Sequence, residues 1–488
     1  MSCTSPTCFL CTMKEQNIVI RRSRIKKHFK EMLSIDQQER VLILSTLWKI
    51  SMNQPEDPEF PYLEQRVAVR ALGHLASYDS TFEMLVVHEE EAEEWASQIQ
   101  CWSLHLLNCF AIRGRSIDLI CNQDFLKDLS SMWGGLMNHT SPSGIGLIRI
   151  LCYTQTGRTK VSESKEVIEC ICNLSRSSDD WQYMGIDCLL LLLLDMNTRY
   201  KVLEIASFYL LDLIELRKLG ERSNLGQKIT KALLIDYKNG KSGINNPEID
   251  RRLKEIWVTK VDKNRREKLM SDEKLEEKRV LVNLIKQQAN HHFWSGDIES
   301  AVKKYTEGLK SCPLKLRKER IVLYSNRAQC YLLVNDPDSA ISDTTRSLSI
   351  SKPTNSHVKS LWRRSQAYYM KGLAKESLMD CLMFINAFVT EDKRKHAKIP
   401  YYAVHMIKKL MDLTWFFAPA KSKLSATNSS TDCNSSNEEF PKDEMPGLYT
   451  ILEDPVIRKD KEATKRKDTR YENQKSSIVQ GYINITNN

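Results

Sequence analysis

Glycine and proline are scarce in this chain, which has 17 Gly and 14 Pro among its 488 residues. This scarcity excludes a collagen-like chain and argues against a disordered or turn-rich all-β chain, so it favours helix. Hydrophobic residues make up 41% and charged residues 27%, and most of the chain can therefore bury a core. Because the chain is too long for one compact core, we predict two or three domains or one elongated stack.

A long apolar run is also missing. The most apolar stretch, residues 189–194, is six leucines between Asp187 and Asp195, and it is too short to span a bilayer. Residues 1–20 contain no basic segment followed by an apolar one, so we expect no secretory signal. These absences predict a cytoplasmic protein with reduced cysteines and no membrane insertion. The basic run at residues 21–27 leaves two interpretations open, nuclear import and a solvated helix start.

Motifs for metal binding, catalysis or nucleic-acid binding are equally scarce. Cys8 and Cys11 have a Cys-x-x-Cys spacing with Cys3 nearby, which could supply half of a tetrahedral zinc site, but no second pair follows. Residues 36–250 contain no P-loop, nucleophile elbow, zinc-protease helix or Rossmann glycine pattern. The net charge of +10 comes from dispersed basic residues without a nucleic-acid-binding motif. We therefore expect no metal, no cofactor, no enzymatic activity and no nucleic-acid partner.

Residues 36–250 show a succession of helical patterns without a convincing strand. Beyond an opening helix pair, segments are predicted near 89–113, 116–133, 143–153, 164–176, 179–196, 199–218, 223–238 and 247–260. Residues 144–146 (Gly-Ile-Gly) are interpreted as a turn. Many short helices in a row predict an α-solenoid.

Two segments of this region, 68–76 and 168–175, carry small and large apolar residues at helical spacing. They resemble the armadillo repeat, which implies an armadillo/HEAT-like solenoid; an unclassified helical bundle is the alternative. Around this region we predict a poorly patterned N-terminal segment at 1–35 and a charged hinge or helix at 251–279. Residues 418–488, rich in Ser, Thr, Asn and mixed charge, are predicted to be a disordered tail.

Residues 280–388 contain an internal repeat. Small residues recur at separations of 39 and 37, as Ala289, Ala328 and Ser365 and again as Ala301, Ala340 and Ser377. The pattern predicts three pairs of antiparallel helices, at 280–295 and 298–311, at 319–334 and 338–350, and at 356–371 and 374–388. Small residues are expected where two helices approach closely.

This repeat resembles the tetratricopeptide repeat (TPR). In the first unit, Phe293, Tyr305 and Pro313 fall where that family places aromatic residues and proline. The resemblance implies a three-repeat TPR domain at 280–417, with residues 396–417 as a capping helix. The spacing exceeds the usual period of about 34, and the third unit departs most because Ser377 and Cys381 replace the usual Ala and aromatic.

Five polar residues lie on the first helices of the three pairs. They are Lys286 and Asn290 in the first, Asn326 in the second, and Lys359 and Arg363 in the third. Residues four apart share a helix face, and in TPR domains the first helices line a concave groove. The resemblance thus implies that all five side chains face an open groove and not the core. Three cations and two amides suit a ligand with two carboxylates.

The set resembles the dicarboxylate clamp of co-chaperones, which holds the C-terminal Glu-Glu-Val-Asp of cytosolic heat-shock protein 90 and heat-shock protein 70. It implies a non-enzymatic co-chaperone or adaptor, with the armadillo-like region binding a client that the sequence does not identify. The alternative is a general interaction scaffold for other acidic C-termini. The order of modules resembles a plant armadillo/TPR group, whereas the myosin-chaperone family has the TPR part first.

Overall fold

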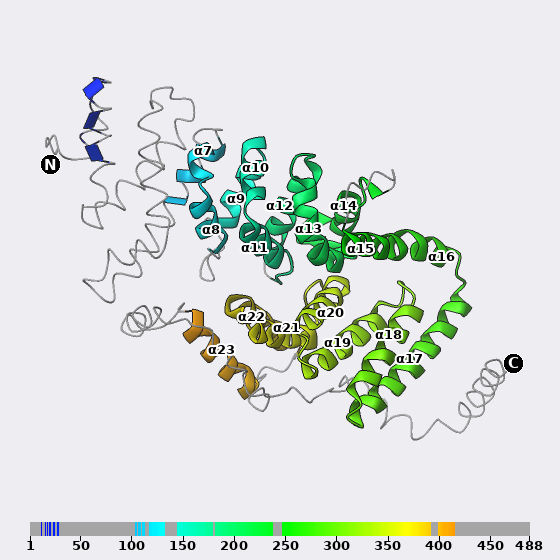
Figure 1. The fold of residues 1–488 in the computed structure, drawn as a ribbon. Helices are drawn as coiled ribbons and strands as arrows, with labels where there is room; N and C mark the ends of the chain where they lie inside the picture. Colours follow the sequence, from blue (N-terminus) through cyan, green and yellow to red (C-terminus); the bar gives the residue numbers. More distant parts are fainter. Residues whose placement is uncertain are drawn as a thin grey trace, which may run out of the picture. The chain divides into compact units, whose positions relative to one another are not determined.

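The computed structural model describes parts of 11–28 and 103–112, and then residues 117–131, 144–178, 181–237, 246–391 and 399–414. The chain divides into two compact units, 1–444 and 445–488, and the described residues all lie in the first. The regular elements among these residues are helices, apart from one hairpin (Figure 1), which confirms the all-α fold class. Among the described helices, none is both long and apolar enough to cross a membrane. The segment 68–76 and the predicted tail lie outside the described residues.

The N-terminal region is a stack of short helices. In chain order they are α7 (Ile117–Ile120), α8 (Gln123–Ser131), α9 (Gly144–Cys152), α10 (Gln155–Glu163), α11 (Lys165–Ser175), α12 (Gln182–Leu194), α13 (Arg199–Leu210), the short 3₁₀ helix η1 (Leu211–Leu213), α14 (Leu225–Leu233) and α15 (Pro247–Trp257). Helices α9, α12 and α14 pack in one row, and α8, α11, α13 and α15 pack in a second row against it. Two rows of stacked helices form the predicted α-solenoid.

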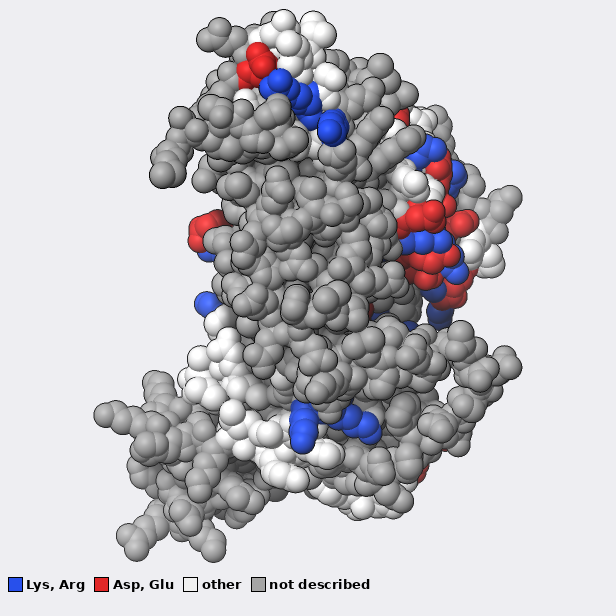
Figure 2. All heavy atoms as spheres, turned by 90° about the vertical axis from the view of Figure 1, so that its left-hand side faces the viewer, with Lys and Arg blue, Asp and Glu red and all other residues white. Residues whose placement is uncertain are grey.

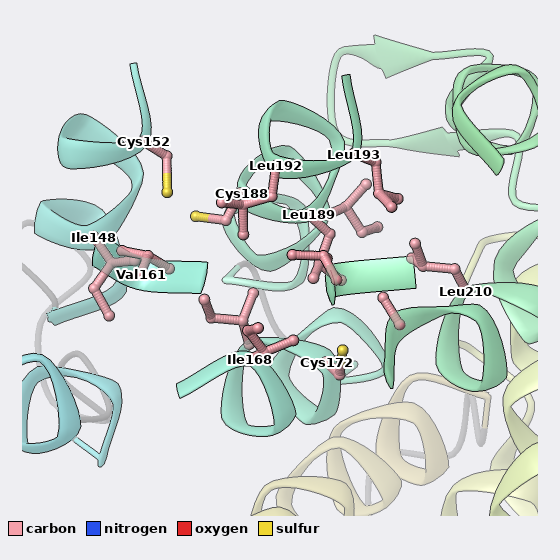
Figure 3. Close-up of a cluster of buried hydrophobic side chains, with 14 of the residues drawn as sticks. Ile148, Cys152, Val161, Ile168, Cys172, Cys188, Leu189, Leu192, Leu193 and Leu210 are labelled. Atoms are coloured by element: carbon pink, nitrogen blue, oxygen red, sulfur yellow. The ribbon is translucent and has the colours of Figure 1, made fainter. Parts of the chain in front are cut away.

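The six-leucine run is explained by its position inside this stack. It lies in α12, which packs between α9 and α14 in its own row and against α11 and α13 in the other. Leu189, Leu192 and Leu193 are fully buried, and only the last leucine of the run, Leu194, is mostly exposed. Figure 3 shows the three buried leucines among side chains of neighbouring helices. A helix that is apolar on nearly every side is one that is enclosed by protein.

Residues 144–146, interpreted as a turn, form the first residues of helix α9 (Gly144–Cys152), which agrees with the helix predicted near 143–153. The N-terminus of α9 lies directly on the C-terminal part of α8, and a Cβ atom at Gly144 would be 2.0 Å from the carbonyl oxygen of Leu129. The glycine is therefore required by the close approach of two backbones, which the sequence pattern does not distinguish from a turn.

Two elements of this region were not predicted. Helix α10 has few apolar residues, and its start is fixed locally by Thr154, whose side chain accepts a hydrogen bond from the Gly157 N–H. The hairpin consists of β1 (Lys218–Leu219) and β2 (Arg222–Ser223). Strands of two residues are too short to show alternation.

The described part of the C-terminal region consists of three antiparallel helix pairs and one further helix. The pairs are α17 (Asp272–Trp294) with α18 (Ile298–Ser311), α19 (Arg317–Leu333) with α20 (Pro337–Ile350), and α21 (Val358–Met370) with α22 (Ala374–Glu391); α23 (Tyr401–Thr414) packs on α22. These are the three predicted pairs followed by the predicted capping helix. Residues 415–417, the aromatic end predicted for that helix, lie outside the described residues.

The three pairs share one turn. The first helix of each ends at a residue with positive φ, which is Gly296, Asn335 or Gly372, and these positions keep the separations of 39 and 37. Asn is the non-glycine residue that most readily adopts this conformation. Asp297 and Asp336 then accept hydrogen bonds from backbone N–H groups of the second helix.

The serines of the third pair preserve the close packing of the first two. The six aligned small residues are completely buried. Ser377 donates a hydrogen bond to the Ser365 carbonyl at 2.7 Å, and Ser365 donates to the Trp362 carbonyl at 2.7 Å. A serine can therefore replace alanine between these helices because its hydroxyl is satisfied by backbone oxygen.

The charged segment 251–279 is helical along most of its length. Helix α15 continues into a π-helix, η3 (Val258–Lys263), and then into α16 (Asn264–Lys268). Helix α17 begins at Asp272, with the side chain of Ser271 accepting a hydrogen bond from the Lys274 N–H. The first TPR-like helix is thus eight residues longer at its N-terminus than predicted.

The two regions are joined by buried polar contacts centred on Asp212 of η1. Its carboxylate accepts hydrogen bonds from Arg176 of the solenoid at 2.5 Å, and from Ser342 at 2.6 Å and Arg346 at 2.8 Å, both on α20. Asp212 is 2% exposed. Such a carboxylate is tolerated only because it is fully paired.

Two further arginines connect the regions. Arg364 of α21 makes two hydrogen bonds of 2.7 Å to Asp380 and donates to the Arg176 carbonyl at 2.6 Å. Arg320 of α19 binds both carboxylate oxygens of Glu215. The solenoid therefore packs on the side of the C-terminal region to which α20 belongs.

Gly144→Ala should lower the free energy of unfolding by about 1–3 kcal/mol, because the added methyl group meets backbone that cannot move aside. Chemical denaturation followed by circular dichroism measures this. The matched control is Gly308→Ala, also in a helix, where the new Cβ would be 3.3 Å from a movable Leu323 methyl group. Equal destabilisation by both substitutions would contradict the packing argument.

Asp212→Ala should lower the free energy of unfolding by about 3–5 kcal/mol, because it leaves two arginines without their shared carboxylate. The control is Asp338→Ala, which breaks the ion pair between Asp338 and Lys371. The Asp338 side chain is 55% exposed, so this substitution should change stability little. If the two variants have the same denaturation midpoint, Asp212 does not hold the regions together.

Candidate functional site

The five predicted site residues lie on α17, α19 and α21, the first helices of the three pairs. These helices are neighbours of one another, since α19 packs against both α17 and α21. In Figure 1 they appear as one row from green to yellow. We call the surface that carries the five residues the first-helix face.

Arg363 is the centre of this face. Its guanidinium donates to Gln329 at 2.9 Å, to Ser325 at 2.7 Å and to Asn326 at 3.4 Å, all on α19. Ser325 and Gln329 are four residues apart and so present both acceptors on one face of α19. Arg363 thereby spans the second and third repeats.

The two asparagines are connected through a buried tyrosine. The Tyr305 hydroxyl of α18 donates to the Asn290 side-chain oxygen at 2.6 Å, and Tyr305 also hydrogen-bonds Asn326. Burial raises the pKa of Tyr305 well above its usual value, so the hydroxyl stays protonated. Asn290, Asn326 and Arg363 therefore belong to one hydrogen-bonded network that crosses all three repeats.

The two lysines flank this network. Lys286 precedes Asn290 by four residues on α17, and Lys359 precedes Arg363 by four residues on α21. Both lysines are partly exposed. Their position one helical turn from the network leaves the charged ends of two flexible side chains at its border.

The expectation that all five side chains face open solvent is wrong for two of them. Asn326 is 6% exposed and Arg363 is 2% exposed. The reason is the close packing of neighbouring first helices, which places these side chains between α19 and α21. Substitution of Arg363 therefore removes structural hydrogen bonds as well as a charge.

Arg363 differs electrostatically from other buried arginines of the protein. Burial lowers the pKa of Arg320 and Arg327, but the carboxylates of Glu215 and Asp343 raise it by more. For Arg363, burial dominates and lowers the pKa to about 10. The guanidinium is still charged at neutral pH, and its acceptors Ser325, Asn326 and Gln329 carry no charge. An approaching carboxylate would strengthen its hydrogen bonding.

Three residues of the network, Tyr305, Ser325 and Gln329, were not predicted as site residues. Tyr305 was assigned to the aromatic position of the repeat. That position explains why its ring is buried, but it does not predict the hydrogen bond of its hydroxyl to Asn290. The signal that was available is the Ser-x-x-x-Gln spacing from 325 to 329 on a helix already carrying Asn326.

The described residues hold no group of three or more His, Cys, Asp or Glu side chains that could bind a metal ion. Cys3 and Cys8 of the half zinc motif lie outside them, so the expected absence of a metal stays a prediction. On the face shown in Figure 2, the described acidic and basic side chains lie intermingled. Among the coloured residues of that face, no extended patch carries charges of only one sign.

Comparison with known proteins supports a helical-repeat architecture. A family model described as plant ARM repeat matches residues 1–63, 61–92 and 85–122. This match includes residues 1–35, the N-terminal segment that the sequence pattern left unassigned. It agrees with the armadillo-like interpretation of the N-terminal region and covers a quarter of the chain.

Relatives match shorter stretches. Protein unc-45 homolog B of Danio rerio is 33% identical over 88 residues, which is 18% of this chain and 9% of the relative. Tetratricopeptide repeat protein 12 of Homo sapiens is 33% identical over 18% of this chain and 12% of its own length. Sperm-associated antigen 1 of Mus musculus is 35% identical over 21% of this chain and 10% of its own length. The chain thus spans about a tenth of the length of these relatives.

A solved structure, the TPR domain of P58(IPK), aligns with 83% of this chain and 96% of its own length, at a TM-score of 0.23 and 12% identity. This similarity is too weak to indicate a shared fold.

Proposed function

We propose that this protein is a non-enzymatic, cytoplasmic adaptor whose first-helix face binds an acidic protein C-terminus. The ligand proposed is the Glu-Glu-Val-Asp tail of a heat-shock protein 90 or heat-shock protein 70 chaperone. The observation that carries this proposal is Arg363, a buried guanidinium hydrogen-bonded to neutral side chains at the centre of the face. The similarity to a tetratricopeptide repeat protein supports a role in protein interaction.

The face suits a ligand with two carboxylates for physical reasons. Folding has already removed water from Arg363, so a carboxylate that reaches it gains a charge-assisted bond without the arginine losing further hydration. Lys286 and Lys359 are partly exposed and can approach a second carboxylate. Asn290 and Asn326 can donate from their amides and so orient the tail.

The N-terminal solenoid is proposed to bind a client protein while the first-helix face holds the chaperone. A general scaffold that accepts other acidic C-termini remains the second candidate, because the charges of the face select carboxylates and not a particular sequence. The two candidates differ in whether Val and the second Glu of the tail contribute to binding.

A peptide ending in Glu-Glu-Val-Asp should bind the full chain in the micromolar range, about 8 kcal/mol of binding free energy. Fluorescence anisotropy with a labelled peptide measures this. Amide capping of its C-terminus should weaken binding sharply, because one carboxylate disappears. Equal binding of capped and free peptides would exclude a carboxylate site. Equal binding of a scrambled acidic tail would favour the scaffold.

Lys359→Glu should cost about 2–5 kcal/mol of peptide binding free energy, because it replaces a cation near the ligand by a like charge. Arg363→Ala should cost as much, and Asn290→Ala less, because loss of Asn290 removes a neutral side chain and leaves the cations of the face in place. Lys303→Glu makes the same charge change at an exposed position on the second helix α18 and should bind normally. If Lys303→Glu weakens peptide binding as much as Lys359→Glu does, binding depends on the net charge of the protein and not on the position of Lys359. Circular dichroism checks that Arg363→Ala is folded.

A further inference from the structure

A second group of cations lies where three segments of the chain meet. Arg217 follows η1 at the end of the solenoid stack, Lys260 and Lys263 lie on the π-helix η3, and Arg320 lies on α19. We call these four residues the junction cluster. Lys260 interacts electrostatically with Arg217 and Arg320, and Lys263 interacts with Arg320. Glu215 lies near both lysines and Arg320.

Hydrogen bonds hold the three segments of the junction in place. Arg320 binds Glu215 through both carboxylate oxygens. Lys263 donates to the Cys312 carbonyl at 2.6 Å, and the nearby Glu267 accepts from the Leu314 N–H at 2.7 Å. These contacts tie η3 and α16 to the loop between α18 and α19, so Lys263 and Arg320 are held in place by hydrogen bonds.

The junction cluster carries more positive than negative charge. Glu215 interacts with Lys260, Lys263 and Arg320, and Glu267 interacts with Lys263, so the four cations exceed these two carboxylates by two. Counting Asp262, which lies between the two lysines on η3, still leaves a positive excess. Burial lowers the pKa of Lys260 and Lys263, and the neighbouring Arg320 lowers both further. The two carboxylates therefore do not neutralise the cluster.

The depth of the cations forms a gradient from the surface inward. Arg217 is exposed, Lys260 and Lys263 are partly buried, and Arg320 is 3% exposed. The lysines lie three residues apart on a π-helix, a rare local structure that is found frequently at functional sites. A small ligand that approaches Arg217 would meet the partly buried ammonium groups of Lys260 and Lys263 before the more deeply buried Arg320.

We propose that the junction cluster binds a compact polyanion that carries several phosphate ester groups, of the kind that inositol phosphates present. Each phosphate group brings a charge of about −1.5 to −2 and three acceptor oxygens, which suits lysine ammonium groups approaching from one helix and arginine from another. The same chemistry is offered by a soluble inositol phosphate and by the headgroup of a phosphoinositide lipid. None of the first-helix-face residues takes part, so the site is separate from the proposed peptide site.

Such a ligand would also stabilise the contact between the two regions. Arg217 and Glu215 belong to the solenoid side and Arg320 to the repeat side, with η3 between them. An anion bound by residues from all three segments binds only while they are together, and so shifts the equilibrium toward the joined state.

Inositol hexakisphosphate is the soluble probe for this site. Calorimetric titration of the full chain should show saturable binding that weakens with added salt, and the probe should raise the midpoint of thermal unfolding. Lys260→Gln combined with Lys263→Gln should weaken binding roughly tenfold or more. Arg217→Gln should weaken it less, and because this side chain is exposed the variant tests the site without disturbing the fold. The control, Lys303→Gln combined with Lys408→Gln, removes two exposed lysines elsewhere and should bind normally.

Vesicles of phosphatidylcholine, with and without phosphatidylinositol bisphosphate, test the lipid source of the same chemistry. Binding to the phosphoinositide vesicles that is lost in Lys260→Gln/Lys263→Gln identifies the headgroup as a ligand. The Glu-Glu-Val-Asp peptide should still bind this double variant, which shows that it is folded, and Lys359→Glu should still bind the inositol phosphate. Loss of polyanion binding equally in the control double variant, or absence of binding to both probes, overturns the proposal and leaves the peptide site unaffected.

Discussion

One buried carboxylate sets the relation between the two repeat regions. Asp212 is almost inaccessible, and it is paired with arginines from both sides, Arg176 and Arg346. Either arginine alone in that interior would be costly, and so would the aspartate without them. The solenoid and the helix pairs therefore bury these groups only when they pack together.

Helix α21 carries this constraint to the candidate site. Its consecutive residues Arg363 and Arg364 lie on different sides of the helix. Arg363 bonds to Ser325 and Gln329 on the first-helix face, and Arg364 bonds to Asp380 and to the Arg176 carbonyl of the solenoid. The orientation of the guanidinium proposed to receive a carboxylate is thus fixed by a helix that is also anchored on its opposite side.

The sequence predicted those features that have a local signal. The helix pairs and the buried small residues repeat at separations of 39 and 37, so a single chain displays them. The burial of Arg363 was not predictable, because its acceptors lie more than 30 residues away. The same holds for Asp212 and Arg346, which are 134 residues apart, and for Gly144, whose requirement comes from the backbone of another helix. Contacts between distant segments leave no period in the sequence.

The packing of the solenoid on the repeats has a consequence for how this protein can change over generations. A set of helix pairs moved alone into another chain would carry Arg320, Arg346 and Arg364 on its surface or against an unsuited neighbour, while Glu215 and Asp212 stayed behind. Successful recombination would have to transfer both regions as a unit, and a substitution at Asp212 would have to be accompanied by a change at Arg346 or Arg176. The boundary that a repeat pattern draws near residue 280 is therefore not a boundary of packing.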